Sequence, residues 1–282
     1  MKRRFHQLDV FSAVPLKGNP LAVVHAAQGL SDDTMAAFAR WTNLSETTFL
    51  LPPTAPEADY RVRIWTPGGE LPFAGHPTLG SCHAWLAAGG VPMHADTVVQ
   101  ECGVGLVRVR KTHRPSGQRL AFAAPPLRRT GPLAPALLQR IVQALGVSAE
   151  DVLHHQWVDN GPGWCAVMLR SAAQVLAVRP NGALLNGIKL GLVGAHPAGS
   201  ECAFELRALY HDTAALTEDP ATGSLNASVA QWLIGAGLAP ASYVAAQGAV
   251  VQRAGRVFID KTGDTVWVGG DVAICIEGEV EL

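Results

Sequence analysis

The chain has 282 residues, of which 48 % are hydrophobic and 16 % are charged, and its formal net charge is −1 at pH 7. This composition is typical of a globular protein and excludes a disordered chain. The near-zero charge, without a basic stripe, argues against a nucleic-acid partner, and a chain of this length is expected to form two domains.

Short runs that are rich in β-branched or aromatic residues and bounded by Gly or Pro predict strands along most of the chain. In the first half these are "FHQLDVF", "LAVVHA", "ETTFLLPP", "DYRVRIWTP" and "GLVRVRKT". In the second half they are "RLAFAAPP", "WCAVMLR", "QVLAVRP", "CAFELRALY" and several strands within residues 249–282. Many strands with few helices indicate a chain of the α+β class.

Four segments carry helical patterns. Ser31–Trp41 opens with a capping serine and two aspartates, and Leu133–Leu145 has apolar residues at helical spacing and stops before Gly146. A third helix is predicted to start near His76, in "PTLGSCHAWLAAGG", and a fourth near Thr222, in "GSLNASVAQWLIGAGL". The last two are rich in Ala, Gly, Leu and Trp, so they are expected to be mostly buried.

These two apolar helices resemble each other. Placing Trp232 on Trp85 also aligns Leu233 with Leu86, Ser228 with Ser81 and Gly237 with Gly90. The match suggests an internal duplication into two similar domains, each with strands around one helix, although two unrelated buried helices are the alternative. We expect one domain over 1–115 plus 265–282 and the other over 116–264.

Signals for export, membrane insertion and cysteine chemistry are missing. The basic N-terminal residues are not followed by a sustained apolar run, so no signal peptide is expected, and no apolar run reaches the length of a membrane span. The five cysteines are odd in number and form no CxxC pair, which argues against a disulfide framework and a zinc site. We therefore expect a cytoplasmic protein without a membrane partner.

Both apolar helices begin with small residues, in "AGHPT" around Gly75 and in "ATGSLN" around Gly223 and Ser224. A helix start presents free N–H groups and a partial positive charge, and small residues let an anion approach them. Two such helix starts facing one cleft would hold a small substrate that carries a carboxylate. The alternative is that Gly and Ser act here only as ordinary capping residues.

Three ionisable residues lie near these helix starts, and each has two interpretations. His76, beside Pro77 in the first helical turn, either caps the helix or is a neutral histidine that takes part in hydrogen bonding or proton transfer. Glu46 in "NLSETTFL" is either a solvated surface charge or a partly buried proton shuttle with a raised pKa. Asp219 in "TEDPATGS" either caps the following helix or acts beside it as an acid, a base or a partner for an amine.

Other kinds of chemistry lack their motifs. The chain has no GxSxG nucleophile motif, no GxGxxG dinucleotide fingerprint and no phosphate-binding loop. His154 and His155 are adjacent but have no further ligand at metal-binding spacing. We therefore expect neither a metal nor a cofactor.

Several motifs occur together and in a fixed order: "QLDVFSAVPLKGNPLAVV", "NLSETTFL", "RIWTPGGELPFAGHPTLGSCHAWL", "ECGVGLVRV" and "DPATGSLNASVAQWL". With them, nearly the whole chain resembles the PhzF family of phenazine-biosynthesis isomerases. The resemblance implies a diaminopimelate-epimerase-like fold of two pseudo-symmetric domains. In this fold each domain wraps a mostly antiparallel, barrel-like sheet around a central helix, and the active site lies between the domains.

The resemblance also implies which residues act. It assigns catalytic roles to Glu46, His76 and Asp219 and substrate-binding roles to Asn19, Gly75, Gly223 and Ser224. It implies that Glu46 moves a proton between carbons of a small carboxylated substrate, as in the isomerisation of trans-2,3-dihydro-3-hydroxyanthranilate, without a cofactor. Family members are commonly dimers, so a homodimer is expected.

Two alternatives to an isomerase remain. Epimerases and racemases of this fold use paired cysteines, but Ala74 precedes Gly75 here and no cysteine occurs from 203 to 274, so a two-thiol mechanism is not expected. Proton abstraction for epimerisation or elimination by other groups is the first alternative. The second is a non-catalytic protein that binds small molecules on the same scaffold.

Overall fold

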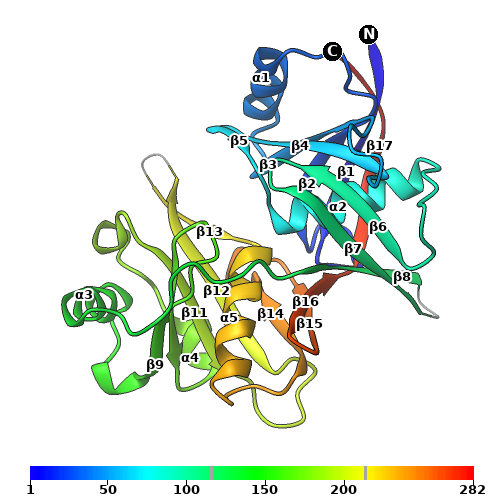
Figure 1. Ribbon diagram of the computed structural model, residues 1–282. Helices are drawn as coiled ribbons and strands as arrows, with labels where there is room; N and C mark the ends of the chain where they lie inside the picture. Colours follow the sequence, from blue (N-terminus) through cyan, green and yellow to red (C-terminus); the bar gives the residue numbers. More distant parts are fainter. Residues whose placement is uncertain (115–116, 213–214) are drawn as a thin grey trace. The chain divides into compact units, whose positions relative to one another are not determined.

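The computed structural model describes residues 1–114, 117–212 and 215–282. The chain divides into two compact units (Figure 1): unit 1 comprises Met1–Ala123 with Gly269–Leu282, and unit 2 comprises Ala124–Val268.

Unit 1 is strand-rich, and its described residues form two helices. Its strands are β1 (Lys2–Val10), β2 (Asn19–Val24), β3 (Glu46–Leu51), β4 (Tyr60–Thr66), β5 (Gly69–Leu71), β6 (Thr97–Cys102), β7 (Gly105–Arg114), β8 (Gly117–Ala123) and β17 (Val272–Glu281). Its helices are α1 (Asp32–Thr42) and α2 (Gly75–Ala87). Because β1 pairs with β17 along its whole length, the two chain termini lie side by side (Figure 1).

Unit 2 has a similar content. Its strands are β9 (Val152–Trp157), β10 (Trp164–Leu169), β11 (Lys189–Ala195), β12 (Phe204–Asp212), β13 (Ala215–Asp219), β14 (Ser242–Gln247), β15 (Gly255–Thr262) and β16 (Thr265–Gly270), whose last residues belong to unit 1. Its helices are α3 (Pro135–Leu145), α4 (Ala172–Ala177) and α5 (Gly223–Gly235), with short 3₁₀ turns at Ala149–Asp151, Gly182–Leu185 and Ala249–Val251.

The order of strand pairing is the same in the two units. In unit 1, β1–β2 is antiparallel, β2–β3 parallel, β3–β4 and β4–β5 antiparallel, β4–β6 parallel and β6–β7 antiparallel. Unit 2 shows the same sequence of directions: β9–β10 is antiparallel, β10–β11 parallel, β11–β12 and β12–β13 antiparallel, β12–β14 parallel and β14–β15 antiparallel. This repeat confirms the predicted pseudo-symmetric α+β fold.

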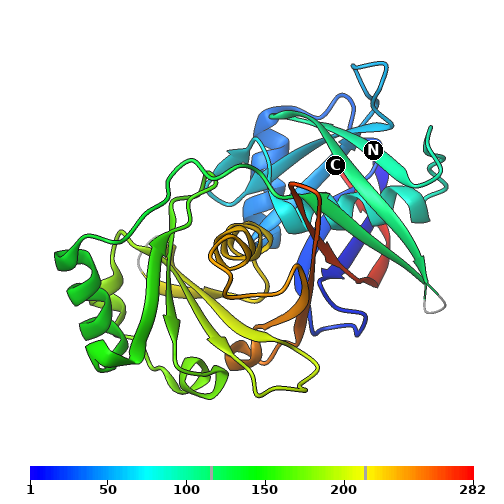
Figure 2. The same cartoon turned by 60° about the horizontal axis from the view of Figure 1, so that its bottom comes forward.

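A buried helix follows the fifth strand of each repeat. α2 and α5 are both 13 residues long, and most of their residues are buried, as their apolar composition predicts. Figure 2 looks nearly along α5, with the strands of its unit around it. The packing is close: a Cβ on Gly80 of α2 would lie 2.5 Å from Leu21 Cδ2 of β2, so a larger residue there would have to displace the Leu21 side chain.

One predicted strand is wrong. The segment "QVLAVRP" lies largely in a helix, because α4 covers Ala172–Ala177. Ser171 caps this helix by accepting a hydrogen bond from the Gln174 N–H at 3.2 Å, and Val175 packs into the core of unit 2. An apolar run this short fits a strand or a buried helical turn equally well, so periodicity cannot separate them. All four predicted helices are present, with starts shifted by at most two residues.

Candidate active site

In unit 1, three predicted site residues meet where β2, β3 and α2 begin. Glu46 is the first residue of β3 and His76 the second residue of α2, and Glu46 Oε2 lies 3.3 Å from His76 Nε2. Asn19, the first residue of β2, places Nδ2 3.5 Å from His76 Nδ1. The Glu46 side chain is 16 % exposed, whereas Asn19 is fully buried. The fold thus gathers a carboxylate, an imidazole and an amide at one end of the unit.

The His76 ring is neutral at physiological pH. Burial lowers the pKa of His76 to about 3, and a hydrogen bond with the backbone of Pro20 only partly opposes this. Because proline has no N–H, the ring is the donor of that bond, and a neutral imidazole has one N–H to donate. The other ring nitrogen is therefore a proton acceptor. Ala74, rather than His76, is the N-cap residue of α2, and burial is the largest cause of the lowered pKa.

We expect acid to destabilise the fold through His76. In the unfolded chain its pKa is close to 6.5, so below that pH the unfolded state binds a proton that the folded state does not. Stability that is present above pH 6.5 is then lost as the pH falls, by about 1.4 kcal/mol per pH unit down to about pH 3. Urea unfolding of wild type and His76→Gln at a series of pH values measures the difference in slope.

The control for this prediction is His113→Gln, which changes an exposed histidine of β7. The His113→Gln slope should match that of wild type, and the His76→Gln slope should be shallower. Equal slopes in all three proteins would show that His76 is not held neutral by the fold.

In unit 2, Asp219 and the start of α5 are joined by one loop. Asp219 is the last residue of β13, and α5 begins four residues later at Gly223. Gln247 binds both ends: its Nε2 donates to Asp219 O at 3.0 Å, and its Oε1 accepts from the Thr222 N–H at 3.0 Å. Thr222 Oγ1 donates to Asp219 Oδ2. These bonds fix the Asp219 carboxylate beside the helix start.

Gly75 and Gly223 are the first residues of α2 and α5, and both are buried. Neither helix has a side-chain N-cap hydrogen bond, so the first N–H groups are not capped in that way. Ser224, the second residue of α5, is partly exposed, and its hydroxyl accepts a hydrogen bond from Trp164 Nε1 at 3.0 Å. Both helix starts therefore have the polarity that suits a carboxylate.

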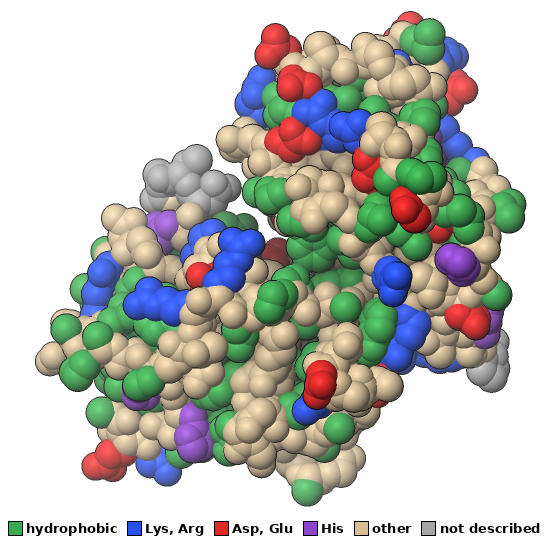
Figure 3. Space-filling view, in the orientation of Figure 1, with side chains coloured by type: hydrophobic (Ala, Val, Ile, Leu, Met, Phe, Trp, Pro, Cys, Tyr) green, Lys and Arg blue, Asp and Glu red, His purple; other side chains and the backbone are tan. Residues whose placement is uncertain are grey.

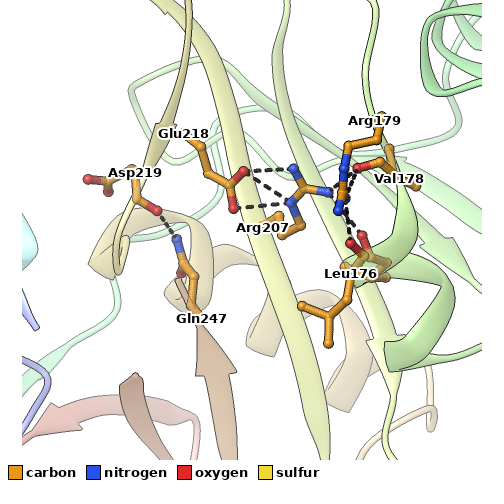
Figure 4. Close-up of polar contacts among 8 residues, drawn as sticks. Leu176, Val178, Arg179, Arg207, Glu218, Asp219 and Gln247 are labelled. Atoms are coloured by element: carbon orange, nitrogen blue, oxygen red, sulfur yellow. Dashed lines mark hydrogen bonds and ion pairs between the residues drawn. The ribbon is translucent and has the colours of Figure 1, made fainter. Parts of the chain in front are cut away.

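A buried ion pair supports β13 directly before Asp219 (Figure 4). Arg207 Nη2 lies 2.7 Å from Glu218 Oε2, Arg207 Nε lies 3.1 Å from both carboxylate oxygens, and the two side chains are 3 % and 9 % exposed. Arg207 Nη1 also donates to Val175 O at 3.0 Å and to Val178 O at 2.8 Å. One guanidinium thus joins β12, β13 and the end of α4.

Sequence reasoning gave no role to Arg207, Glu218 and Gln247. A signal was present for the ion pair, because "CAFELRALY" places an arginine, as well as Glu205, inside a mostly apolar strand, where a buried charge needs a partner. Gln247 gave no such signal, since a glutamine at a strand end is ordinary. The structure places Glu46, His76, Asn19 and Gly75 in unit 1 and Asp219, Gly223 and Ser224 in unit 2.

The described residues offer neither a cluster of metal ligands nor a membrane-spanning helix. On the face in Figure 3, acidic and basic side chains are interspersed. Within residues 1–114, 117–212 and 215–282, no group of three or more His, Cys, Asp or Glu residues is placed to hold a metal ion. In the same part of the chain, every helix is too short or too polar to span a bilayer.

Comparison with known proteins gives consistent matches. The family model described as "Phenazine biosynthesis-like protein" matches residues 8–278. "Antisense-enhancing sequence 1" of Schizosaccharomyces pombe is 33 % identical over 293 residues, covering 98 % of this chain and 97 % of that protein. The trans-2,3-dihydro-3-hydroxyanthranilate isomerase of Pseudomonas chlororaphis is 33 % identical over 221 residues, covering 77 % and 74 %.

A solved structure shows the same fold. A protein described as a predicted epimerase from Pseudomonas aeruginosa superimposes with a TM-score of 0.81 at 29 % identity, covering 99 % of both chains. The likeness extends over both units, so the fold of the whole chain is shared with this protein.

Proposed function

Because the chain belongs to the PhzF family of phenazine biosynthesis-like proteins and is an isomerase of that family, we propose that it moves a proton between two carbons of a small carboxylated substrate without a cofactor. The observation that carries the proposal is the Glu46–His76 pair, with 3.3 Å between Oε2 and Nε2. A partly buried carboxylate next to a neutral histidine is suited to take up a proton and to give it back.

In the proposed mechanism, Glu46 acts first as a base and then as an acid. Its carboxylate removes a proton from a substrate carbon, and the electron pair moves along an adjacent double bond. The protonated Glu46 then returns the proton to the far carbon of that allylic system, so the substrate is isomerised and the enzyme is restored. In unit 1, we assign His76 to a polar substituent and Asn19 with the α2 start at Gly75 to carboxylate binding. In unit 2, we assign Asp219 to a polar substituent and the α5 start at Gly223 and Ser224 to carboxylate binding.

Thiol chemistry is a weaker explanation. Burial raises the pKa of Cys165 to about 12 and also raises the pKa values of Cys82, Cys102 and Cys202. A thiol must be ionised to act as a base, so these four are inert near neutral pH. This favours a carboxylate mechanism over the paired-cysteine route of epimerases.

The substrate that we propose to test is trans-2,3-dihydro-3-hydroxyanthranilate, on which the Pseudomonas chlororaphis relative acts according to its name. The purified protein is incubated with it in D₂O with a chelator, and NMR follows the carbon-bound protons. We expect a product of unchanged mass, apart from any deuterium taken up, with its double bonds moved. Inversion of one centre or loss of water or ammonia would instead indicate an epimerase or a lyase, and binding without reaction a non-catalytic protein.

We also propose that the protein is a homodimer, in keeping with its family. Light scattering coupled to size-exclusion chromatography measures this, with about twice the 29.7 kDa chain mass expected. A mass equal to that of one chain would contradict it.

A further inference from the structure

Ser224 is held by two side chains from the segment at the start of β10. Trp164 Nε1 donates to Ser224 Oγ at 3.0 Å, and Asn160 Nδ2 donates to Ser224 O at 2.9 Å. Trp164 is 4 % exposed and Asn160 is 7 % exposed, so both donors are fixed by packing. Ser224 itself is partly exposed, whereas its neighbours Gly223 and Leu225 are buried.

The Trp164 contact determines what the Ser224 hydroxyl can do. An indole N–H only donates, so Ser224 Oγ is the acceptor of this bond and its own hydrogen points elsewhere. Among the residues that the structure describes, none accepts that hydrogen. The other hydroxyls of α2 and α5 do donate within the protein: Thr78 to Ala74 O, Ser81 to Thr48 Oγ1 and Ser228 to Leu225 O. The Ser224 hydroxyl is therefore left as a donor for a ligand.

Asn160 adds a second polar group that can bind a ligand. Its amide orientation is set by Ser224 O, which can only accept, so Nδ2 faces Ser224. Asn160 Oδ1 is buried and has no hydrogen-bond partner in the described part of the chain. Asn160 Oδ1 would accept a hydrogen bond from a donor on the ligand. An amine or a hydroxyl next to the ligand's carboxylate is such a donor.

The repeat points to the same position in unit 1. There Asn19, the first residue of β2, contacts His76, the second residue of α2. In unit 2, Trp164 is the first residue of β10 and Ser224 the second residue of α5. Both units therefore use a side chain at the start of the second strand of the repeat to orient the second residue of the central helix.

We infer that Trp164 and Asn160 are positioning residues that hold the Ser224 hydroxyl as a hydrogen-bond donor to a substrate carboxylate that has an amine or hydroxyl beside it. This inference rests on the proposed function, since it concerns the same substrate. The positive end of α5 and the fixed hydroxyl then act on one anion. A carboxylate is bound alike in the ground state and the transition state, so the contribution falls on KM rather than on kcat.

The first experiment compares wild type with Trp164→Phe, which removes the N–H and keeps an aromatic ring. Anthranilate, which carries a carboxylate beside an amine and does not react, is titrated by calorimetry. We expect Trp164→Phe to bind it about tenfold more weakly, and KM for dihydrohydroxyanthranilate to rise similarly with kcat within about threefold. The matched control is Trp232→Phe. Trp232 is also buried and lies on α5, the helix that carries Ser224, and its substitution should leave the affinity for anthranilate and KM unchanged.

The second experiment needs no folded Trp164 variant and no turnover. In protein labelled uniformly with ¹³C and ¹⁵N, the indole N–H signal of Trp164 is assigned through its connection to the backbone, so no variant is needed for the assignment. This signal should move in Ser224→Ala, which lacks the acceptor. In wild type it should also move on adding anthranilate, and in Ser224→Ala this response should be lost.

The outcomes separate this inference from the proposed function. An indole signal that is unchanged in Ser224→Ala, or a wild type that binds no anthranilate, overturns the inference. The inference is also overturned if Trp232→Phe weakens anthranilate binding as much as Trp164→Phe does. Binding of anthranilate with the expected indole shifts, but without any isomerisation, supports the inference and contradicts the proposed function.

Discussion

Glu46→Gln should lower kcat by about 10²- to 10⁴-fold, because the amide keeps the shape of the side chain but cannot take a proton from carbon. The Glu46 side chain is 16 % exposed and lies 3.3 Å from His76 Nε2, so the substitution leaves its packing intact. The measurement is the rate of dihydrohydroxyanthranilate turnover, together with deuterium entry at carbon in D₂O. KM should change far less than kcat, since the lost interaction is one made in the transition state.

A matched control is Glu57→Gln, which changes an exposed glutamate of the same unit and should retain full activity. His76→Gln separates the two members of the pair: it retains the carboxylate and should keep part of the turnover that Glu46→Gln loses. If Glu46→Gln exchanges deuterium as fast as wild type, Glu46 is not the group that moves the proton, and the proposed mechanism is wrong.

The features that the sequence predicted well are those that local patterns determine. α2 and α5 are apolar on all sides, which already marks them as buried, and their small first residues mark the helix starts. The likeness between the two segments also predicted the repeat, because a duplicated fold keeps its core helix. Glu46 and His76 were found through motifs, and the structure places them in contact.

The features that the sequence did not predict depend on partners far apart in the chain. Trp164 reads as an ordinary aromatic residue of a strand, and only the folded unit brings its N–H to Ser224, 60 residues later. Gln247 and Asp219 are likewise 28 residues apart. The strand predicted at "QVLAVRP" was wrong partly for a similar reason, since Arg207 of β12 binds the Val175 carbonyl of α4 from 32 residues away. No local propensity encodes such contacts.

Arg207→Met should destabilise unit 2 by about 3–5 kcal/mol, because it leaves the carboxylate of Glu218 buried without its counter-charge. The Glu218 side chain is only 9 % exposed, and the carbonyl oxygen of Val175 in α4 also loses its bond from Arg207. For a unit of this size the loss corresponds to a fall in Tm of about 10 °C. Thermal unfolding followed by circular dichroism, with urea unfolding as a second measure, tests this.

The repeat supplies the control for this prediction. Arg63 and Glu70 form the same pair at the same register between β4 and β5, with Nη2 2.7 Å from Oε2, but their side chains are 17 % and 37 % exposed. Arg63→Met should therefore cost only about 1 kcal/mol or less, because water takes over the hydration of Glu70. The double variant Arg207→Met with Glu218→Leu should recover most of the lost stability, since it leaves no charge unpaired. If Arg207→Met and Arg63→Met had equal effects, burial of the Arg207–Glu218 pair would not add to its contribution to stability, and this prediction would be wrong.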